Sequence, residues 1–280
     1  MTRRGFTLAE LLITMVVMGV LGTALARILI SNSRFVSRQD AMMEARATAR
    51  AAMQAIVTEL HMVPDSGLLM ATRDSIQVTV PYAFGMTCLP TSGSATVAAL
   101  MPTDSLMYAS ATAEGMAWRD AAGAYRQQIP GVMVAPSTNV GQCTGDSIRV
   151  VPGGSLIAMS NIPGARMPPS GSVFYLYQIV TYGFMTSVDV PGRLGLWRRV
   201  GTGAFEELAA PFDTSAKFAL LMGPFMQAQV RAGPLTQTSR DSVRGIELRL
   251  TGQSVGTPQG SPGPQTFDLR TTVAFMNKVY

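Results

Sequence analysis

Few residues of this 280-residue chain have the types and spacing that catalysis needs. The stretch Gly252–Gly256 matches the G-x-S-x-G pattern of a serine nucleophile, which requires a strand before it, a helix after it and a histidine base. Here a segment rich in proline and glycine follows, and His61 is the single histidine. Glu206 and Glu207 are adjacent, so on a strand they point to opposite faces. We therefore expect no enzyme activity.

Metal and cofactor chemistry also lacks the residues it would need. The sequence contains no phosphate-binding loop, dinucleotide fingerprint or zinc-protease motif. Cys88 and Cys143 are the only cysteines, and with His61 they fall short of the four ligands of a structural zinc site. In an exported protein the two cysteines instead predict one disulfide, worth about 4 kcal/mol in the chain-entropy model. We expect neither a metal nor a cofactor.

The N-terminus carries a different chemistry, a lone carboxylate in an apolar run. Phe6 to Ala26 is 21 residues long with Glu10 as its only charge, and Arg3 and Arg4 precede it. As a helix this run would span about 32 Å, close to the thickness of a bilayer core. The sequence therefore predicts a segment that lies in, or passes through, a membrane.

Two interpretations of this segment require no special family. It could be a secretory signal peptide cut after Ala26, although the apolar run exceeds the usual ~7–15 residues. It could also be a plain membrane anchor in which Thr7 and Glu10 form a capping box at the start of a helix. That second interpretation explains Thr7 and Glu10 together, but it leaves Gly5–Phe6 and the preceding arginines unexplained.

A third interpretation comes from the stretch RRGFTLAELLITMVVMGVLG, which resembles the prepilin signature of type IV pilins and type II secretion pseudopilins. The resemblance implies that a prepilin peptidase cuts after Gly5 and methylates the new N-terminus of Phe6. Glu10 then becomes the fifth residue of the mature chain. A carboxylate in hydrocarbon seeks a partner, and the Phe6 ammonium of a neighbouring subunit can supply one during assembly.

Helical periodicity continues far beyond the apolar run. We expect one helix over 6–63, about 87 Å long, with its membrane part at 6–26 and a leader peptide at 1–5. Pro64 is the first proline after the helix begins, and the turn residues Asp, Ser and Gly follow it. Apolar residues recur every three or four positions in the second half, at Met42, Ala45, Ala49, Met53, Ile56, Leu60 and Val63.

Residues 64–280 read as a β-rich globular domain. The stretch 85–145 is rich in Gly, Ser, Thr and Ala with weak periodicity, so we interpret it as an insertion or long loop. Residues 252–265 read as a flexible surface connection. Short runs rich in β-branched and aromatic residues predict strands at 75–80, 147–151, 173–184, 194–200, 225–231, 243–250 and 267–275.

The C-terminal third adds to the resemblance. The stretches LGLWRRVGTGAFEELAAPF, VRGIELRLTG and FDLRTTVAFMNK look like those of minor pilins and J-type pseudopilins. The implied fold is α+β, with one long N-terminal helix packed on a C-terminal antiparallel β-sheet domain. The implied protein is a minor pilin or pseudopilin at the tip, or active in initiation, of a type IV pilus or type II secretion pseudopilus. It would be anchored in the inner membrane by one span, with a periplasmic C-terminal domain, and would join a surface filament after assembly.

The charge balance leaves one alternative function open. The net charge is +5, from 22 basic and 17 acidic residues, and the basic residues are scattered without forming a block. This balance is compatible with a nucleic-acid partner. An adhesin or a DNA-uptake subunit is therefore the alternative to a purely structural subunit, and a soluble protein secreted after cleavage at Ala26 is the other.

Overall fold

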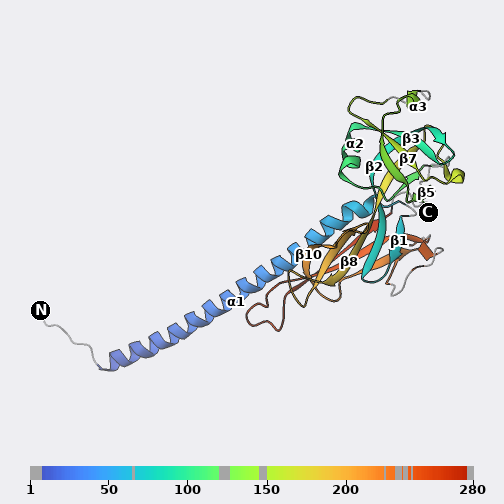
Figure 1. Ribbon diagram of the computed structural model, residues 1–280. Coiled ribbons are helices and arrows are strands. Elements are labelled where there is room, and N and C mark those ends of the chain that lie inside the picture. Colours follow the sequence, from blue (N-terminus) through green and yellow to red (C-terminus); the bar gives the residue numbers. More distant parts are fainter. Residues whose placement is uncertain are drawn as a thin grey trace.

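The apolar N-terminal run continues as one uninterrupted helix, α1 (Leu8–His61), in the computed structural model of the protein. The structure describes residues 8–64, 67–119, 127–144, 150–223, 225–230, 235, 239–240 and 242–275. The 54 residues of α1 make a rod about 81 Å long. Figure 1 shows its first half standing clear of the rest of the molecule. The expected long helix is confirmed over its described part.

Beyond α1 the described chain forms mainly strands, which join in one antiparallel sheet. Its main path runs β12-β11-β13-β10-β9-β8-β2-β3-β7-β6, while β14 pairs with β13, β1 with β2, and β4 with β5 and β8. The expected α+β fold, a long helix followed by an antiparallel sheet domain, is confirmed. The strands are β1 (Leu68–Ala71), β2 (Ser75–Ser92), β3 (Ala95–Leu100), β4 (Gly115–Trp118), β5 (Gln127–Pro130), β6 (Met133–Ser137), β7 (Ser155–Ser160), β8 (Val173–Thr186), β9 (Leu194–Val200), β10 (Glu206–Phe212), β11 (Lys217–Met222), β12 (Gln227–Gln229), β13 (Val243–Gln253) and β14 (Thr266–Ala274).

Two long strands, β2 and β8, run through the whole domain. They pair from Ser75 opposite Gly183 to Met86 opposite Val173, with a register irregularity between Pro81 and Ala83. The domain has two lobes on either side of this irregularity, each with its own hydrophobic core. The lobe that packs on α1 is called the proximal lobe here, and the lobe beyond the C-terminal end of α1 is called the distal lobe (Figure 1).

The proximal lobe buries one face of α1 against the sheet. The buried helix residues recur every three or four positions, which places them on a single stripe. They contact apolar side chains that alternate along the strands, such as Ile246, Leu248 and Leu250 of β13. This alternation of buried and less buried residues is the signature of a strand with one face on a core. The buried stripe consists of Ala45, Ala49, Ala52, Ile56 and Leu60.

The distal lobe corrects the interpretation of 85–145 as a long loop. This stretch instead holds the second half of β2, strands β3 to β6, and helices α2 (Pro102–Ser110) and α3 (Gly141–Thr144). The loop interpretation failed because strand β3 buries Val97, Ala98 and Leu100 on both faces, so its small residues show no alternation. The core of this lobe includes Met116, Ile157, Phe174 and Leu176.

Two of the predicted strands do not appear as expected. Most of 147–151 lies outside the described residues, and Val150 and Val151 are not in a strand. In the predicted 225–231 segment, the described strand is limited to β12. The predictions at 75–80, 173–184, 194–200, 243–250 and 267–275 correspond to β2, β8, β9, β13 and β14.

Candidate assembly site on the long helix

The lone carboxylate of the apolar run lies at the very start of α1. Glu10 is in the first helical turn and is exposed. A negative charge is favourable there because the N-terminal end of a helix carries partial positive charge. Gly5 and Phe6, the predicted cleavage and methylation residues, lie outside the described residues. In the sequence Glu10 follows Phe6, the predicted new N-terminus, by four positions.

The first half of α1 is exposed, with no cover from the other residues that the structure describes. Its large apolar side chains point outward all around the helix, with Leu8 82% exposed and Phe35 58% exposed. Among the described residues, α1 is the one helix long and apolar enough to cross a membrane, judged by length and composition. An apolar surface of this size marks a site of lipid or protein contact.

The second half of α1 docks very closely on β13. A Cβ atom added at Gly252 would lie 2.3 Å from the carbonyl oxygen of Ala45 and 3.2 Å from the Cβ of Ala49. The small alanine side chains and the missing side chain of Gly252 therefore let the helix backbone approach the strand. This contact fixes the height at which the sheet domain sits along α1.

A polar cluster locks the C-terminal end of α1 to the sheet. Glu59 of α1 accepts two hydrogen bonds from the Arg198 guanidinium of β9, at 2.8 and 3.3 Å, and one from the hydroxyl of Tyr182 of β8. The Arg198 and Glu59 side chains are each 24% exposed. A bidentate contact between a guanidinium and a carboxylate fixes the orientation of the two side chains as well as their distance.

The electrostatics keep this cluster in one protonation state. Burial raises the pKa of the Tyr182 hydroxyl above its usual value near 10, and the charge of Glu59 raises that pKa further. Burial alone would lower the pKa of Arg198, but the hydrogen bonds and charge of Glu59 outweigh it, so the pKa is raised. Near neutral pH the tyrosine is therefore a neutral donor and the arginine a cation. No pattern in the sequence indicated the cluster, because its members are up to 139 positions apart.

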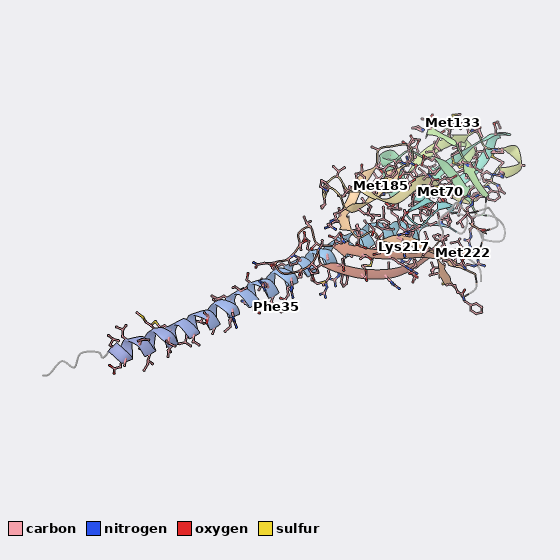
Figure 2. The ribbon with its side chains drawn as sticks, turned by 90° about the horizontal axis from the view of Figure 1, so that it is seen from below. Phe35, Met70, Met133, Met185, Lys217 and Met222 are labelled. Atoms are coloured by element: carbon pink, nitrogen blue, oxygen red, sulfur yellow. A yellow bond between two sulfur atoms is a disulfide. The ribbon has the colours of Figure 1, made fainter. Side chains whose placement is uncertain are left out.

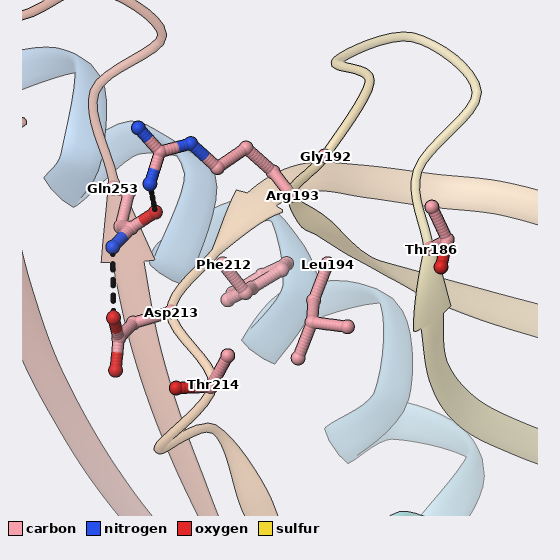
Figure 3. Close-up of a pocket in the computed structure, with 8 residues that line it drawn as sticks. All are labelled: Thr186, Gly192, Arg193, Leu194, Phe212, Asp213, Thr214 and Gln253. Atoms are coloured by element: carbon pink, nitrogen blue, oxygen red, sulfur yellow. Dashed lines mark hydrogen bonds between the residues drawn. The ribbon is translucent and has the colours of Figure 1, made fainter.

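The first three residues of the G-x-S-x-G stretch have structural roles. Gly252 makes the close contact with α1, and Gln253 bridges Arg193 and Asp213 through hydrogen bonds of 3.0 and 2.9 Å. Figure 3 shows this bridge at the edge of a cavity of about 170 Å³, with α1 behind it. Ser254 is fully buried; its hydroxyl donates to the carbonyl of Gly256 and accepts from the backbone N–H of Gln265.

The β13–β14 connection is a surface loop, as interpreted for 252–265, except that its first two residues belong to β13. It also contacts α1 at two points. Arg38 donates to the carbonyl oxygen of Gly260 at 2.9 Å, and the backbone N–H of Val255 donates to the Glu44 carboxylate at 3.2 Å. The glycine and proline content was a sound signal for a loop, but it carried no information about these contacts with the helix.

The two cysteines form the predicted disulfide. Cys88 of β2 and Cys143 of α3 are bonded, with their Cα atoms 4.8 Å apart, and both are buried. They pack with Val97 and Leu156 in a small apolar cluster of the distal lobe. The bond spans 55 positions, so it should stabilise the fold by about 4 kcal/mol in the chain-entropy model.

Comparison with known proteins gives one match. Residues 1–26 match the family described as the prokaryotic N-terminal methylation motif. No curated protein and no solved structure matches the chain. The matched stretch includes Gly5, Phe6 and Glu10 and leads directly into the exposed apolar half of α1. The chain therefore carries, at its N-terminus, the signature of type IV pilins.

Proposed function

We propose that the protein is a minor pilin or pseudopilin, a structural subunit without catalytic activity. It is made as a single-pass inner-membrane precursor with a periplasmic C-terminal domain. Prepilin peptidase cuts it between Gly5 and Phe6 and methylates Phe6. The product then joins other pilin subunits in a type IV pilus or a type II secretion pseudopilus. The observation that carries this proposal is the methylation motif at residues 1–26, continuous with an exposed apolar helix.

The exposed first half of α1 is suited to two environments, the membrane before assembly and the filament after it. Before assembly, lipid covers its apolar side chains, because the run is long enough to cross a bilayer core. After assembly, the same side chains pack against the helices of neighbouring subunits. In that bundle Glu10 accepts the Phe6 ammonium of a neighbour, which sets the axial register as a polar residue does in a coiled-coil seam.

The distal lobe supports a place at the tip or in initiation. It lies beyond the C-terminal end of α1, as Figure 1 shows. In a stack of parallel, staggered helices, the next subunit along the axis needs that space. A subunit with extra bulk there fits best where no further subunit follows.

Filament fractionation tests the proposal. The full chain is produced in cells that carry a pilus or secretion system, and filaments sheared from the surface or pulled down from the periplasm are probed for it. We expect the chain in the filament fraction with active prepilin peptidase and only in the membrane fraction without it. Release of the domain as a soluble protein in both strains would contradict the proposal.

A further inference from the structure

Three cations from distant parts of the sequence lie side by side on the proximal lobe. Lys217 of β11 is opposite Arg249 of β13, and Arg249 is opposite Arg270 of β14. We call these three residues the cation row. Neighbouring strands are ~4.8 Å apart, so the row spans about 10 Å across three strands. The sequence showed only scattered basic residues, and the strand register brings these three together.

The cation row points away from α1. Leu248 and Leu250 face the helix core, and Arg249 between them therefore faces the opposite side of the sheet. Figure 2 labels Lys217 on this part of the sheet. Arg249 is held by Glu247, two residues earlier on the same face. Within the part of the chain that the structure describes, the Lys217 ammonium and the Arg270 guanidinium make no hydrogen bond or ion pair.

Like charges placed directly opposite on adjacent strands destabilise a sheet, so this arrangement has a cost. The three residues of the row help to line a cavity of about 140 Å³. Hydroxyl groups also line the cavity: Ser215 donates to the Thr251 oxygen at 3.0 Å. Asp268 is the one acidic residue of the lining, and positive charge stays in excess even when Glu247 is counted. Such a site has donors and charge in place for an anion.

We propose that the cation row is a binding site for a phosphate group. An arginine fork and a lysine ammonium are the side chains that bind phosphate oxygens best, and hydroxyls complete the set of donors. The cavity is larger than a single water molecule needs, so it has room for a group of phosphate size. The phosphate belongs to a free phosphate or to the phosphodiester chain of a nucleic acid.

Lipid headgroups of the anchoring membrane are too far away to be the source. Gly252 of β13 packs on Ala45 of α1, which fixes the height of the neighbouring Arg249. Ala45 lies about 28 Å along the helix from the end of the apolar run at Ala26. That distance exceeds the ~8 Å screening length at physiological salt several times over. The ligand therefore comes from the aqueous side.

The test uses the full chain in maltoside micelles, which contain no phosphate, and two probes. Calorimetry measures binding of inorganic phosphate, and fluorescence anisotropy measures binding of a labelled oligothymidylate at several salt concentrations. The variant is the double substitution Lys217→Gln and Arg270→Gln. The control, Arg27→Gln with Arg50→Gln, removes the same charge from exposed positions of α1. Thermal unfolding checks that both variants are folded.

We expect the double variant to bind at least one probe about 100-fold more weakly, roughly tenfold per cation, and the control to bind like the original chain. If the oligothymidylate binds, the slope of log K against log salt should be about −2 for three contacts and about −0.7 in the double variant. Binding of phosphate alone identifies a free ligand, and binding of the oligothymidylate identifies a phosphodiester. Failure of both probes to bind, or equal binding by variant and control, would overturn the proposal.

Discussion

Glu10 and Glu59 are carboxylates at opposite ends of α1, and they have different roles. Glu59 forms hydrogen bonds within the subunit, to Arg198 and Tyr182, which hold the end of the helix on the sheet. Glu10 lies in the first turn of the helix half that is exposed among the described residues. Glu59 therefore stabilises the fold, and in our proposal Glu10 stabilises the assembly.

Replacing Glu10 should separate assembly from processing. Glu10→Gln keeps the size of the side chain and removes the charge that would pair with the Phe6 ammonium. We expect cleavage after Gly5 to continue, while recovery in the filament fraction falls by about tenfold or more, because an ion pair in hydrocarbon has no solvent to replace it. Glu44→Gln, a loss of the same charge from the docked half of α1, is the control. Equal recovery of the Glu10 variant and the original chain would reduce Glu10 to a helix cap.

The hydrogen bond from Tyr182 to Glu59 predicts that the stability of the fold depends on pH. The pKa of Tyr182 is raised in the folded state, so its contribution to stability is fully present below the usual tyrosine pKa near 10 and is lost as the pH rises further. Tyr182→Phe should cost about 1–2 kcal/mol of unfolding free energy at neutral pH by removing the bond to Glu59. The difference in unfolding free energy between the Tyr182→Phe variant and the original chain should become smaller above about pH 10. Denaturant unfolding from pH 7 to about 11.5 measures this difference. A difference that stays constant over this range would refute the proposed role of the Tyr182 hydroxyl.

At the residue scale the sequence was informative only where the motif is local. The N-terminal signature lies in one continuous stretch, and the two cysteines pair because no other cysteine exists. The polar cluster around Glu59 and the cation row each combine residues from three separate elements. Their formation depends on strand register, which a single sequence does not reveal.

The contact of α1 with β13 can be tested at the scale of the element. Gly252→Ala puts a methyl group against the backbone of Ala45, so helix and strand must move apart, and we expect a loss of about 1–3 kcal/mol in unfolding free energy. Gly256→Ala, in the same short stretch, meets no atom within 4 Å and should change little. Thermal unfolding of both variants decides the matter. If the two variants lose the same stability, the close approach at Gly252 contributes nothing.

Alternation along the chain predicted β13, whereas β3 and β11, which are buried on both faces, carry no alternation and were missed. Strand β13 alternates along its length, and its pattern predicted it. Strand β11 buries Phe218 to Leu221 without a break, because β13, β12 and the core all contact it, and its pattern is lost. The same physics explains why the distal lobe was taken for a loop. Long helices are easier to predict, because the helical spacing of apolar residues in α1 repeats over many turns.

The whole molecule has two cores that share strands β2 and β8 but are stabilised separately. The disulfide lies in the distal lobe, far from the packing of α1. We expect Cys88→Ser with Cys143→Ser to lose about 4 kcal/mol of stability. Hydrogen exchange should accelerate in β3 and β7 and stay unchanged in β13 and the second half of α1. Uniform acceleration throughout the domain would show that the lobes unfold as one unit.

The most direct test of the central claim is the mass of the mature N-terminal peptide. The full chain is purified from cells with an active prepilin peptidase, digested and analysed by mass spectrometry. Our account predicts a chain that begins at Phe6 with one methyl group on its α-amine, and a precursor that begins before Gly5 in cells without the peptidase. A mature chain that begins at Arg27 would contradict the account and would make residues 1–26 an ordinary signal peptide.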